Sequence, residues 1–376
     1  MEQLTELLRP DELASLRLRG LYQSRGYRRF RINRFEEYGF YMENRRFLAN
    51  ENVLTFTDLD GRLLALKPDI TLSIIKNIKP APGEPERLYY TENVYRPDRQ
   101  RSGFREIGQI GVEYIGDLDP PAVIEVTALA AESLLAISKD YILDINHMGF
   151  FEGFCDELAQ EGYLLPSKRL IELVTSKNGH ELRRLATECN LPAVKTEALA
   201  GMAAGYGEFP AQLAYARQIA GHNQSMLEAI AELNQLYRVM AALGLAQGLR
   251  LDFSLILDPA FYSGIVYAGY IAALPGKLLS GGCYERMMNK LGKKSGATGF
   301  ALYLDELACL PLAEKEFDTD VLVIYETGAD SLELAKAVRE LIKQGLSVRL
   351  SRQKPERPRA SLIRRFVDGR LEEDLC

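Results

Sequence analysis

The stretch from Arg87 to Gly116 consists of two extended runs joined by a charged loop. Both runs mix β-branched and aromatic residues with polar ones, a composition typical of a half-buried sheet. These apolar residues are Leu88, Tyr89, Tyr90, Val94 and Tyr95 in the first run and Ile107, Ile110, Val112, Tyr114 and Ile115 in the second. The pattern predicts two antiparallel strands with a turn at Ser102-Gly103, so the fold must be organised around a sheet.

The loop between the two predicted strands is rich in arginine: it carries Arg96, Arg99, Arg101 and Arg105. The ordinary interpretation is a solvated hairpin loop, because charged turns are common. The functional interpretation is an anion site, because the guanidinium group is a rigid, permanently charged fork that binds phosphate or carboxylate. Other parts of the sequence favour the second interpretation.

Four segments in the same order resemble the motifs of class II aminoacyl-tRNA synthetases in their histidyl form. The predicted strand pair is similar to motif 2, with Arg96 at the position of the α-phosphate arginine. The run Leu66 to Thr71 (LKPDIT) is similar to L-R-P-E-G-T, and Ser280 to Tyr284 (SGGCY) to A-G-G-R-Y. The run Gly299 to Leu307 (GFALYLDEL) is similar to motif 3, and the resemblance extends over residues 10–312.

The resemblance implies an α+β fold, a class II aminoacyl-tRNA synthetase-like antiparallel sheet flanked by helices. It implies three parts: a synthetase-like domain at residues 1–147 and 247–314, a helical insertion at 148–246, and a small C-terminal α/β tail domain at 315–376. The three-four spacing of apolar residues between 148 and 246 independently favours helices there.

The N-terminal part predicts a helix from Pro10 to near Gly26 and a strand over Tyr27–Phe35, where the family carries its motif 1 dimer interface. An edge strand protected by arginine is the alternative for that segment. Val53–Leu66 predicts a hairpin with a tight two-residue turn at Asp60-Gly61. A short helix follows, with Thr71 near its cap.

In the middle of the chain, three-four spacing predicts helices at Ala122–Ile137, Phe150–Leu158, Lys168–Val174, His180–Cys189, Val194–Met202 and Gln224–Leu243. Strands are expected at Tyr141–Asn146, Leu249–Leu257 and Ile265–Ala272. In the tail, Val321–Tyr325, Leu332–Gln344 and Leu346–Leu350 predict a βαβ unit, and Arg352–Arg365 a solvated segment.

The resemblance implies a histidine-binding pocket that uses carboxylates for the ligand's ammonium group and ring nitrogens. Position by position, it assigns Asp69 and Thr71 to the E-G-T run, and Gln109 and Glu113 to the family's Q-x-G-x-E run. Arg96 and Tyr262 complete the expected ligand set, which is Asp69, Thr71, Arg96, Gln109, Glu113 and Tyr262.

The sequence departs from the synthetase pattern where the family has its catalytic cations. The family's L-V-R-G-L-D-Y-Y run is similar to Leu255 to Tyr262, with Leu257 at the arginine position. In motif 3, Glu306 replaces the arginine that holds the ATP tail, and it follows Asp305. We therefore expect no catalytic residues and no adenylation by this chain.

Composition limits the other classes of function. The chain has 376 residues, 47% of them hydrophobic, and a net charge of −6, which argues against a generally basic surface for nucleic acid. Its five cysteines and three histidines are scattered, so neither a disulfide framework nor a metal site is predicted. The absence of a long apolar run predicts a cytoplasmic protein that does not contact a membrane.

A synthetase-like body without catalytic arginines and with a short tail resembles the regulatory subunits of ATP phosphoribosyltransferase. That resemblance implies a short-form catalytic partner, L-histidine as effector, no cofactor, and a dimer within a hetero-oligomer, with a hetero-octamer expected. The implied role is the first step of histidine biosynthesis and its feedback control. Two alternatives remain: a divergent histidyl-tRNA synthetase, and a synthetase-like paralogue that binds another amino acid or protein.

Overall fold

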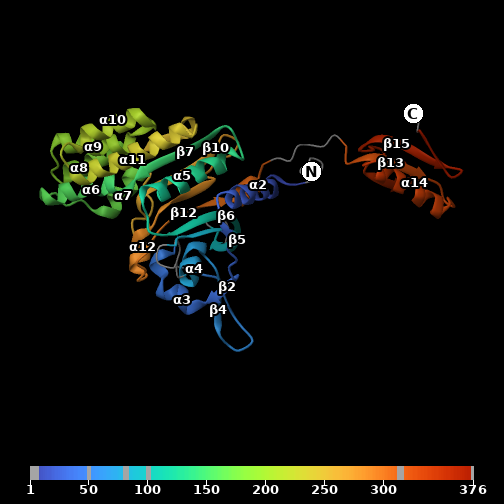
Figure 1. Ribbon diagram of the computed structural model, residues 1–376, viewed down its shortest axis with the longest axis horizontal. Coiled ribbons are helices and arrows are strands. Elements are labelled where there is room, and N and C mark those ends of the chain that lie inside the picture. Colours follow the sequence, from blue (N-terminus) through green and yellow to red (C-terminus); the bar gives the residue numbers. More distant parts are fainter. Residues whose placement is uncertain (1–7, 49–51, 79–83, 99–102, 311–316, 374–376) are drawn as a thin grey trace. The chain divides into compact units, whose positions relative to one another are not determined.

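The computed structural model describes residues 8–48, 52–78, 84–98, 103–310 and 317–373, and the chain forms two compact units, Met1–Leu310 and Pro311–Cys376 (Figure 1). The first unit contains a nine-stranded sheet and a three-stranded sheet, and the second contains a four-stranded sheet. Residues 148–246 fall inside the first unit, so their separation as a domain stays a prediction.

The nine-stranded sheet has the order β1-β5-β6-β12-β11-β10-β7-β9-β8. Its strands are β1 (Arg28–Arg29), β5 (Glu86–Pro97), β6 (Phe104–Gly116), β7 (Tyr141–His147), β8 (Tyr206–Glu208), β9 (Leu249–Asp252), β10 (Ser263–Ile271), β11 (Leu279–Cys283) and β12 (Gly296–Tyr303). Neighbours from β5 to β7 pair antiparallel, whereas β7 and β9 run parallel. The predicted antiparallel sheet flanked by helices is confirmed.

Strands β5 and β6 are the pair predicted at Arg87 to Gly116, and they pair from Glu86 with Ile115 to Pro97 with Phe104. The backbone N–H of Asp98 donates to the carbonyl of Gly103 at 3.0 Å across the mouth of the loop. Arg99, Arg101 and Ser102 lie outside the described residues, so the interpretation of the loop tip remains a prediction.

The two faces of the large sheet are covered differently. Helices α2 (Pro10–Ser24) and α5 (Pro120–Leu135) contribute Leu18, Tyr22, Val126 and Leu134 to one hydrophobic cluster. A second cluster contains Tyr90, Ile107 and Phe261 together with apolar residues of α4 (Ile70–Asn77) and α12 (Glu285–Lys290). Side chains alternate between faces along a strand, so this second face can carry a site beside its own core.

The segment between α2 and α4 differs from the prediction. Of the expected strand Tyr27–Phe35, only Arg28–Arg29 pairs with β5, because the chain then leaves the large sheet and Phe35 begins β2 (Phe35–Glu37) in the small sheet β2-β4-β3. Helix α3 (Tyr38–Glu43) and a 3₁₀ turn at Arg45–Phe47 follow β2.

The hairpin of β3 (Thr55–Thr57) and β4 (Leu63–Leu66) is confirmed, but its turn is not the predicted two-residue type. The last register pair is Thr57 with Leu63, so the loop spans residues 58–62. The carboxylate of Asp58 accepts the N–H groups of Asp60 and Arg62, which stabilises the wider loop, and Gly61 has φ +79°.

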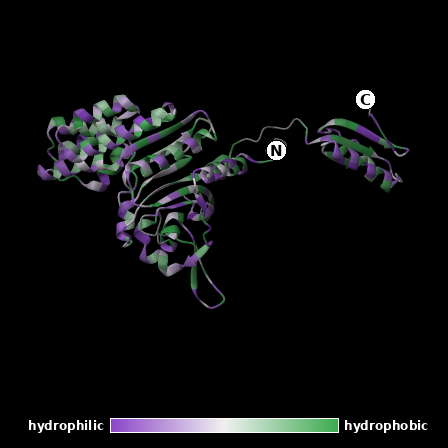
Figure 2. Ribbon diagram, viewed as in Figure 1, coloured by the Kyte–Doolittle hydropathy of each residue, from purple (hydrophilic) through white to green (hydrophobic). Residues whose placement is uncertain are grey.

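The predicted helices of the insertion are present and gather beside the β7 end of the sheet (Figure 1). They are α6 (Met148–Gln160), α7 (Ser167–Thr175), α8 (Gly179–Glu188), α9 (Ala193–Ala204) and α11 (Gln224–Ala242). Figure 2 shows hydrophobic and hydrophilic residues interspersed on them, as in amphipathic helices. Helix α10 (Phe209–Ala220) and strand β8 were missed, and the expected strand Leu249–Leu257 ends at Asp252.

The C-terminal unit contains the predicted βαβ arrangement: β13 (Thr319–Tyr325), α14 (Ser331–Lys343) and β14 (Val348–Ser351), with β13 and β14 parallel. Interpreting all of Arg352–Arg365 as a solvated segment was wrong. Ala360–Val367 forms β15, which lies between β13 and β16 (Arg370–Glu373). Within the segment, Ala360 is buried and Ile363 packs beside it, and the next residue of the strand, Phe366, is buried on the helix side of the sheet.

Candidate functional site

The six residues predicted to bind a ligand surround one pocket on the second face of the large sheet. Asp69, Thr71, Arg96, Gln109, Glu113 and Tyr262 all line it, and it has a cavity volume of about 80 Å³. This is room for a small molecule in place of several waters. The structure therefore brings together residues that are up to 193 positions apart, from Asp69 to Tyr262.

Strand geometry explains why the pocket forms here. Gln109 and Glu113 are separated by an even number of positions on β6, so both point to the same face. In register, Gly299 of β12 lies opposite Glu113 and Tyr303 opposite Gln109, while Glu92 of β5 pairs with Gln109 on the other side. Arg96 is four positions beyond Glu92, so it also faces the pocket.

Asp69 caps helix α4, whereas the sequence predicts Thr71 near this cap. Its Oδ1 accepts the backbone N–H of Leu72 at 2.9 Å, and its backbone is extended. Thr71 lies inside the helix instead, and its hydroxyl donates to Oε1 of Glu113 at 2.8 Å. Burial raises the pKa of Asp69, while the positive charge of Arg96 acts in the opposite direction.

Glu113 is the most deeply buried acid of the pocket, with 2% of its surface exposed. One oxygen accepts from Thr71 and the other from the hydroxyl of Tyr284. Burial raises the pKa of Glu113 to about 8, although these two hydrogen bonds lower it. Near neutral pH the carboxyl group is thus largely protonated, and a cationic ligand would favour its charged form.

This raised pKa predicts how stability depends on pH. A carboxyl whose pKa is 4.5 in the unfolded chain and about 8 in the fold costs stability progressively as pH rises from 4.5 towards 8. Replacing Glu113 with Gln removes this cost, up to about 4 kcal/mol at the upper end. Thermal unfolding at pH 5 and pH 8 should show a smaller loss of Tm for Glu113→Gln than for the wild type.

An equal pH dependence in the two proteins would contradict the raised pKa of Glu113. The comparison is needed because burial also raises the pKa values of Asp69 and Asp144, and both groups contribute to the pH dependence of the wild type and of the variant.

Gly299 leaves the space that Glu113 occupies. A Cβ at position 299 would lie 2.1 Å from Oε2 of Glu113 and 2.4 Å from the carbonyl of Val112. We expect Gly299→Ala to destabilise the fold by about 1–3 kcal/mol and to displace Glu113. Denaturant unfolding tests this, with Gly20→Ala in α2 as control, since a Cβ there meets nothing within 4 Å. Equal stability of the two variants would show that the pocket relaxes freely.

Arg96 contacts the segment that carries Asp69. Its Nε donates to the carbonyl of Pro68 at 2.9 Å, and its Nη2 lies 3.6 Å from Oδ2 of Asp69. The guanidinium group thus supports the edge of the pocket and also presents a cation to it.

Several pocket residues were not predicted, and most of them are aromatic: Tyr90, Phe261, Tyr284 and Tyr303, together with Ser280. Burial raises the pKa of Tyr90, Tyr262, Tyr284 and Tyr303, so these phenols stay neutral and can donate or accept hydrogen bonds. A sequence signal existed for Tyr284, the last residue of the run SGGCY, and for Tyr303 within the motif 3 run.

The expected catalytic positions contribute no cation to the pocket. Leu257 packs on the first hydrophobic cluster, and Glu306 lies in the first turn of α13 (Leu304–Ala308), where its charge adds to the burial that raises the pKa of Tyr303. Asp305 is engaged elsewhere, because it accepts the backbone N–H of Gly108 at 2.9 Å. Lys277, which was not predicted, donates to the hydroxyl of Ser280 at 3.3 Å.

The ranges that the structure describes contain no group of three or more His, Cys, Asp and Glu side chains arranged to hold a metal ion. In the same ranges no helix has both the length and the apolar character needed to cross a membrane.

Comparisons with known proteins agree with this geometry. Residues 5–307 match the family model of histidyl-tRNA synthetase. The chain is 30% identical to the ATP phosphoribosyltransferase regulatory subunit of Moorella thermoacetica, over 94% of this chain and 92% of that protein.

Two solved structures share the fold. An ATP phosphoribosyltransferase regulatory subunit/histidyl-tRNA synthetase from Bacillus halodurans has a TM-score of 0.73 at 24% identity, over 91% of this chain and 88% of that one. A chain of the ATP phosphoribosyltransferase complex from Thermotoga maritima has a TM-score of 0.62 at 16% identity, over 80% of this chain and 99% of that one. From the family model and the Moorella relative, the chain belongs to the ATP phosphoribosyltransferase regulatory subunits, which are built on the histidyl-tRNA synthetase fold.

Proposed function

We propose that this chain binds L-histidine in the pocket around Glu113 and, as the regulatory subunit of an ATP phosphoribosyltransferase, transmits that binding to a short catalytic subunit. The observation that carries the proposal is the combination of an intact acidic pocket with Leu257 and Glu306 at the positions of the catalytic arginines. The protein keeps the groups that recognise an amino acid and lacks those that would activate it.

The chemistry of the pocket suits histidine. A free amino acid brings an ammonium group, for which Asp69 is the charged partner, and the imidazole ring brings polar nitrogens for Glu113 and Gln109. The carboxylate of the ligand needs a cation, and Arg96 supplies one. Phenols of Tyr262 and Tyr284 can complete the remaining hydrogen bonds, so that no buried polar group is left unpaired.

Regulation follows from linkage between binding and assembly. A ligand changes an equilibrium only by its difference in affinity for the two states. If histidine favours a restrained assembly, that assembly must bind histidine more tightly by the same factor. The proposal also includes that this chain self-associates within a hetero-octamer and has a contact surface for the catalytic subunit.

The Thermotoga complex supports the partner, because one of its chains has this fold. The test is to mix the purified chain with the short catalytic subunit from the same organism and to assay formation of phosphoribosyl-ATP. We expect the catalytic subunit to be activated by this chain, and histidine to inhibit the mixture more strongly than the catalytic subunit alone. Failure to bind or activate it would refute the regulatory role.

The second candidate is a divergent histidyl-tRNA synthetase. Arg96 favours it, because it occupies the α-phosphate position of motif 2, and the matching family model covers residues 5–307. Leu257 and Glu306 oppose it, because they stand where the family has the arginines that bind ATP and the reacting centre.

A further inference from the structure

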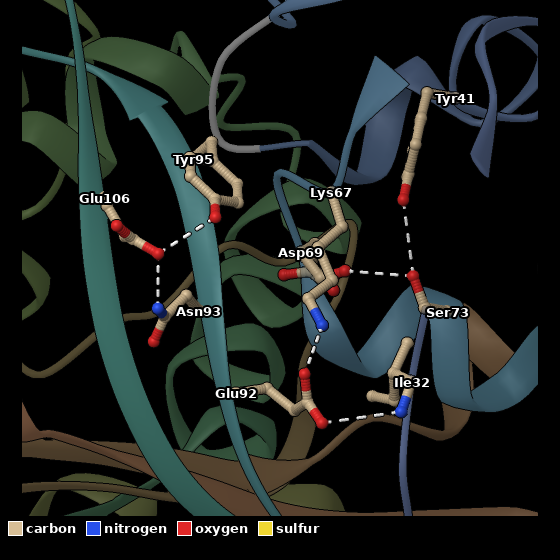
Figure 3. A network of polar contacts seen from close by, with 9 residues as sticks. All are labelled: Ile32, Tyr41, Lys67, Asp69, Ser73, Glu92, Asn93, Tyr95 and Glu106. Atoms are coloured by element: carbon tan, nitrogen blue, oxygen red, sulfur yellow. Dashed lines mark hydrogen bonds and ion pairs between the residues drawn. The ribbon is translucent and has the colours of Figure 1, made fainter. Parts of the chain in front are cut away.

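Lys67 has an unusual environment for a lysine. It is fully buried, and among the residues that the structure describes no other lysine or arginine is buried. Its Nζ lies 2.6 Å from Oε2 of Glu92, whose side chain is 16% exposed (Figure 3). Burial of an ammonium group is unfavourable unless the group is paired. Since neither Lys67 nor Glu92 lines the pocket, binding a ligand directly does not explain the pair.

The pair belongs to a clamp that holds the edge of the pocket. Along β5, Glu92 and Arg96 are four positions apart and face the same side. Opposite them runs the short segment Lys67–Asp69. Lys67 pairs with Glu92 at one end of the segment, and Asp69 pairs with Arg96 at the other. Between the two ion pairs, the backbone N–H of Tyr95 donates to the carbonyl of Lys67 at 3.0 Å.

The clamp fixes the position of Asp69 from one side, and helix α4 fixes it from the other. Arg96 binds the carbonyl of Pro68, directly between Lys67 and Asp69. On the helix side, the hydroxyl of Ser73 donates to the backbone carbonyl of Asp69 at 3.2 Å (Figure 3). Loss of the Lys67–Glu92 pair would remove the anchor at the Lys67 end, so that only the contacts of Arg96 and the bonds within helix α4 would still hold Asp69.

We propose that Lys67 is a positioning residue: paired with Glu92, it places Asp69 and Arg96 for the ligand and so determines the affinity of the pocket without touching the ligand. The proposal rests on the proposed function where it concerns histidine. Its structural part, the ordering of the segment Lys67–Asp69, can be measured without any ligand.

The experiment compares four variants of the full chain, each with a single substitution. Lys67→Met keeps the apolar stem and removes the charge, and Lys67→Arg restores a cation. Glu92→Gln removes the charge of the acid at nearly constant size. Lys76→Met is the matched control, since Lys76 pairs with Glu36 on the exposed side of α4. Histidine affinity is measured by calorimetry, and amide hydrogen exchange is followed at Leu72 and Tyr95, whose N–H groups bind Asp69 and Lys67.

We expect Lys67→Met and Glu92→Gln to weaken histidine binding at least tenfold and to accelerate exchange at Leu72 and Tyr95 only, whereas Lys67→Arg and Lys76→Met resemble the wild type. Unchanged exchange at these two amides overturns the proposal, and so does faster exchange spread evenly over β6 and β12, which would indicate general destabilisation. If Lys67→Met does not fold, Glu92→Gln decides. If the wild type binds no histidine, the proposed function fails. Hydrogen exchange at the two amides still tests whether the Lys67–Glu92 pair orders the segment Lys67–Asp69.

Discussion

Supplied with histidine, ATP and Mg²⁺, the purified chain should exchange pyrophosphate into ATP at a rate far below that of an authentic synthetase. Two charge-assisted contacts to the reacting phosphates are absent at Leu257 and Glu306. At about 1.5–3 kcal/mol each, their loss corresponds to roughly a hundred- to ten-thousandfold in rate. The negative charge of Glu306 beside the triphosphate would lower the rate further.

The assay needs a histidyl-tRNA synthetase as positive control and the double variant Leu257→Arg, Glu306→Arg as a probe. We expect the double variant to recover little activity, because the segment Asp258-Pro259-Ala260 also differs from the family's pattern. Exchange by the wild-type chain at the rate of the control enzyme would support the synthetase alternative and contradict the regulatory role.

Glu113→Gln should separate activation of the catalytic subunit from its inhibition by histidine. The substitution removes one charge-assisted hydrogen bond inside the pocket, so histidine binding should weaken by about 1.5–3 kcal/mol, or roughly ten- to a hundredfold. Glu113 is 2% exposed and lies at no surface that a partner could contact, so activation should be retained. Inhibition curves of the reconstituted complex measure both effects.

Glu106→Gln is the control for this variant. Glu106 is on the same strand, is exposed, and accepts from Tyr95 at 2.9 Å instead of facing the pocket. The wild type should also release a proton when it binds histidine at pH 7, where the imidazole ring is largely neutral, because an imidazole N–H that donates to Glu113 favours the carboxylate and lowers its raised pKa. Calorimetry in buffers of different ionisation enthalpy detects this release, which the Gln variant should lack. Normal inhibition of Glu113→Gln would place the effector site elsewhere.

Site residues could be predicted where the family resemblance identified the position and the alternation of side chains along a strand gave the face to which it points. Gln109 and Glu113 illustrate this, because their even spacing on a predicted strand already places them on one face. Tyr90 and Tyr303 follow the same alternation on their own strands. They reach the pocket only because β5, β6 and β12 pair in one particular register, which a single sequence does not reveal. Asp69 and Thr71 are both good capping residues, and only the observed backbone shows that Asp69 takes the cap.

Parts of the fold were missed for different physical reasons. Helix α10 buries Phe209, Leu213, Ala216 and Ala220, a three-four pattern in which alanines make the hydrophobic signal weak. Strand β15 was missed because basic residues and two prolines directly precede it and two arginines lie within it, although it lies between two other strands of its sheet. Strand β8 is three residues long, and its pairing with β9 depends on tertiary structure more than on local preference.

The parallel pairing of β7 with β9 restricts how this protein can be shortened by engineering. β7 ends at His147 and β9 begins at Leu249, and two neighbouring parallel strands cannot be joined by a tight turn, because the chain must first travel back along the sheet. The helices from α6 to α11 therefore include a connection that the sheet itself requires. A minimal version of the protein would have to retain one helix of about a dozen residues or more at this place. A short glycine-serine graft between His147 and Leu249 would delete β8 with the insertion and would also prevent β9 from pairing with β7.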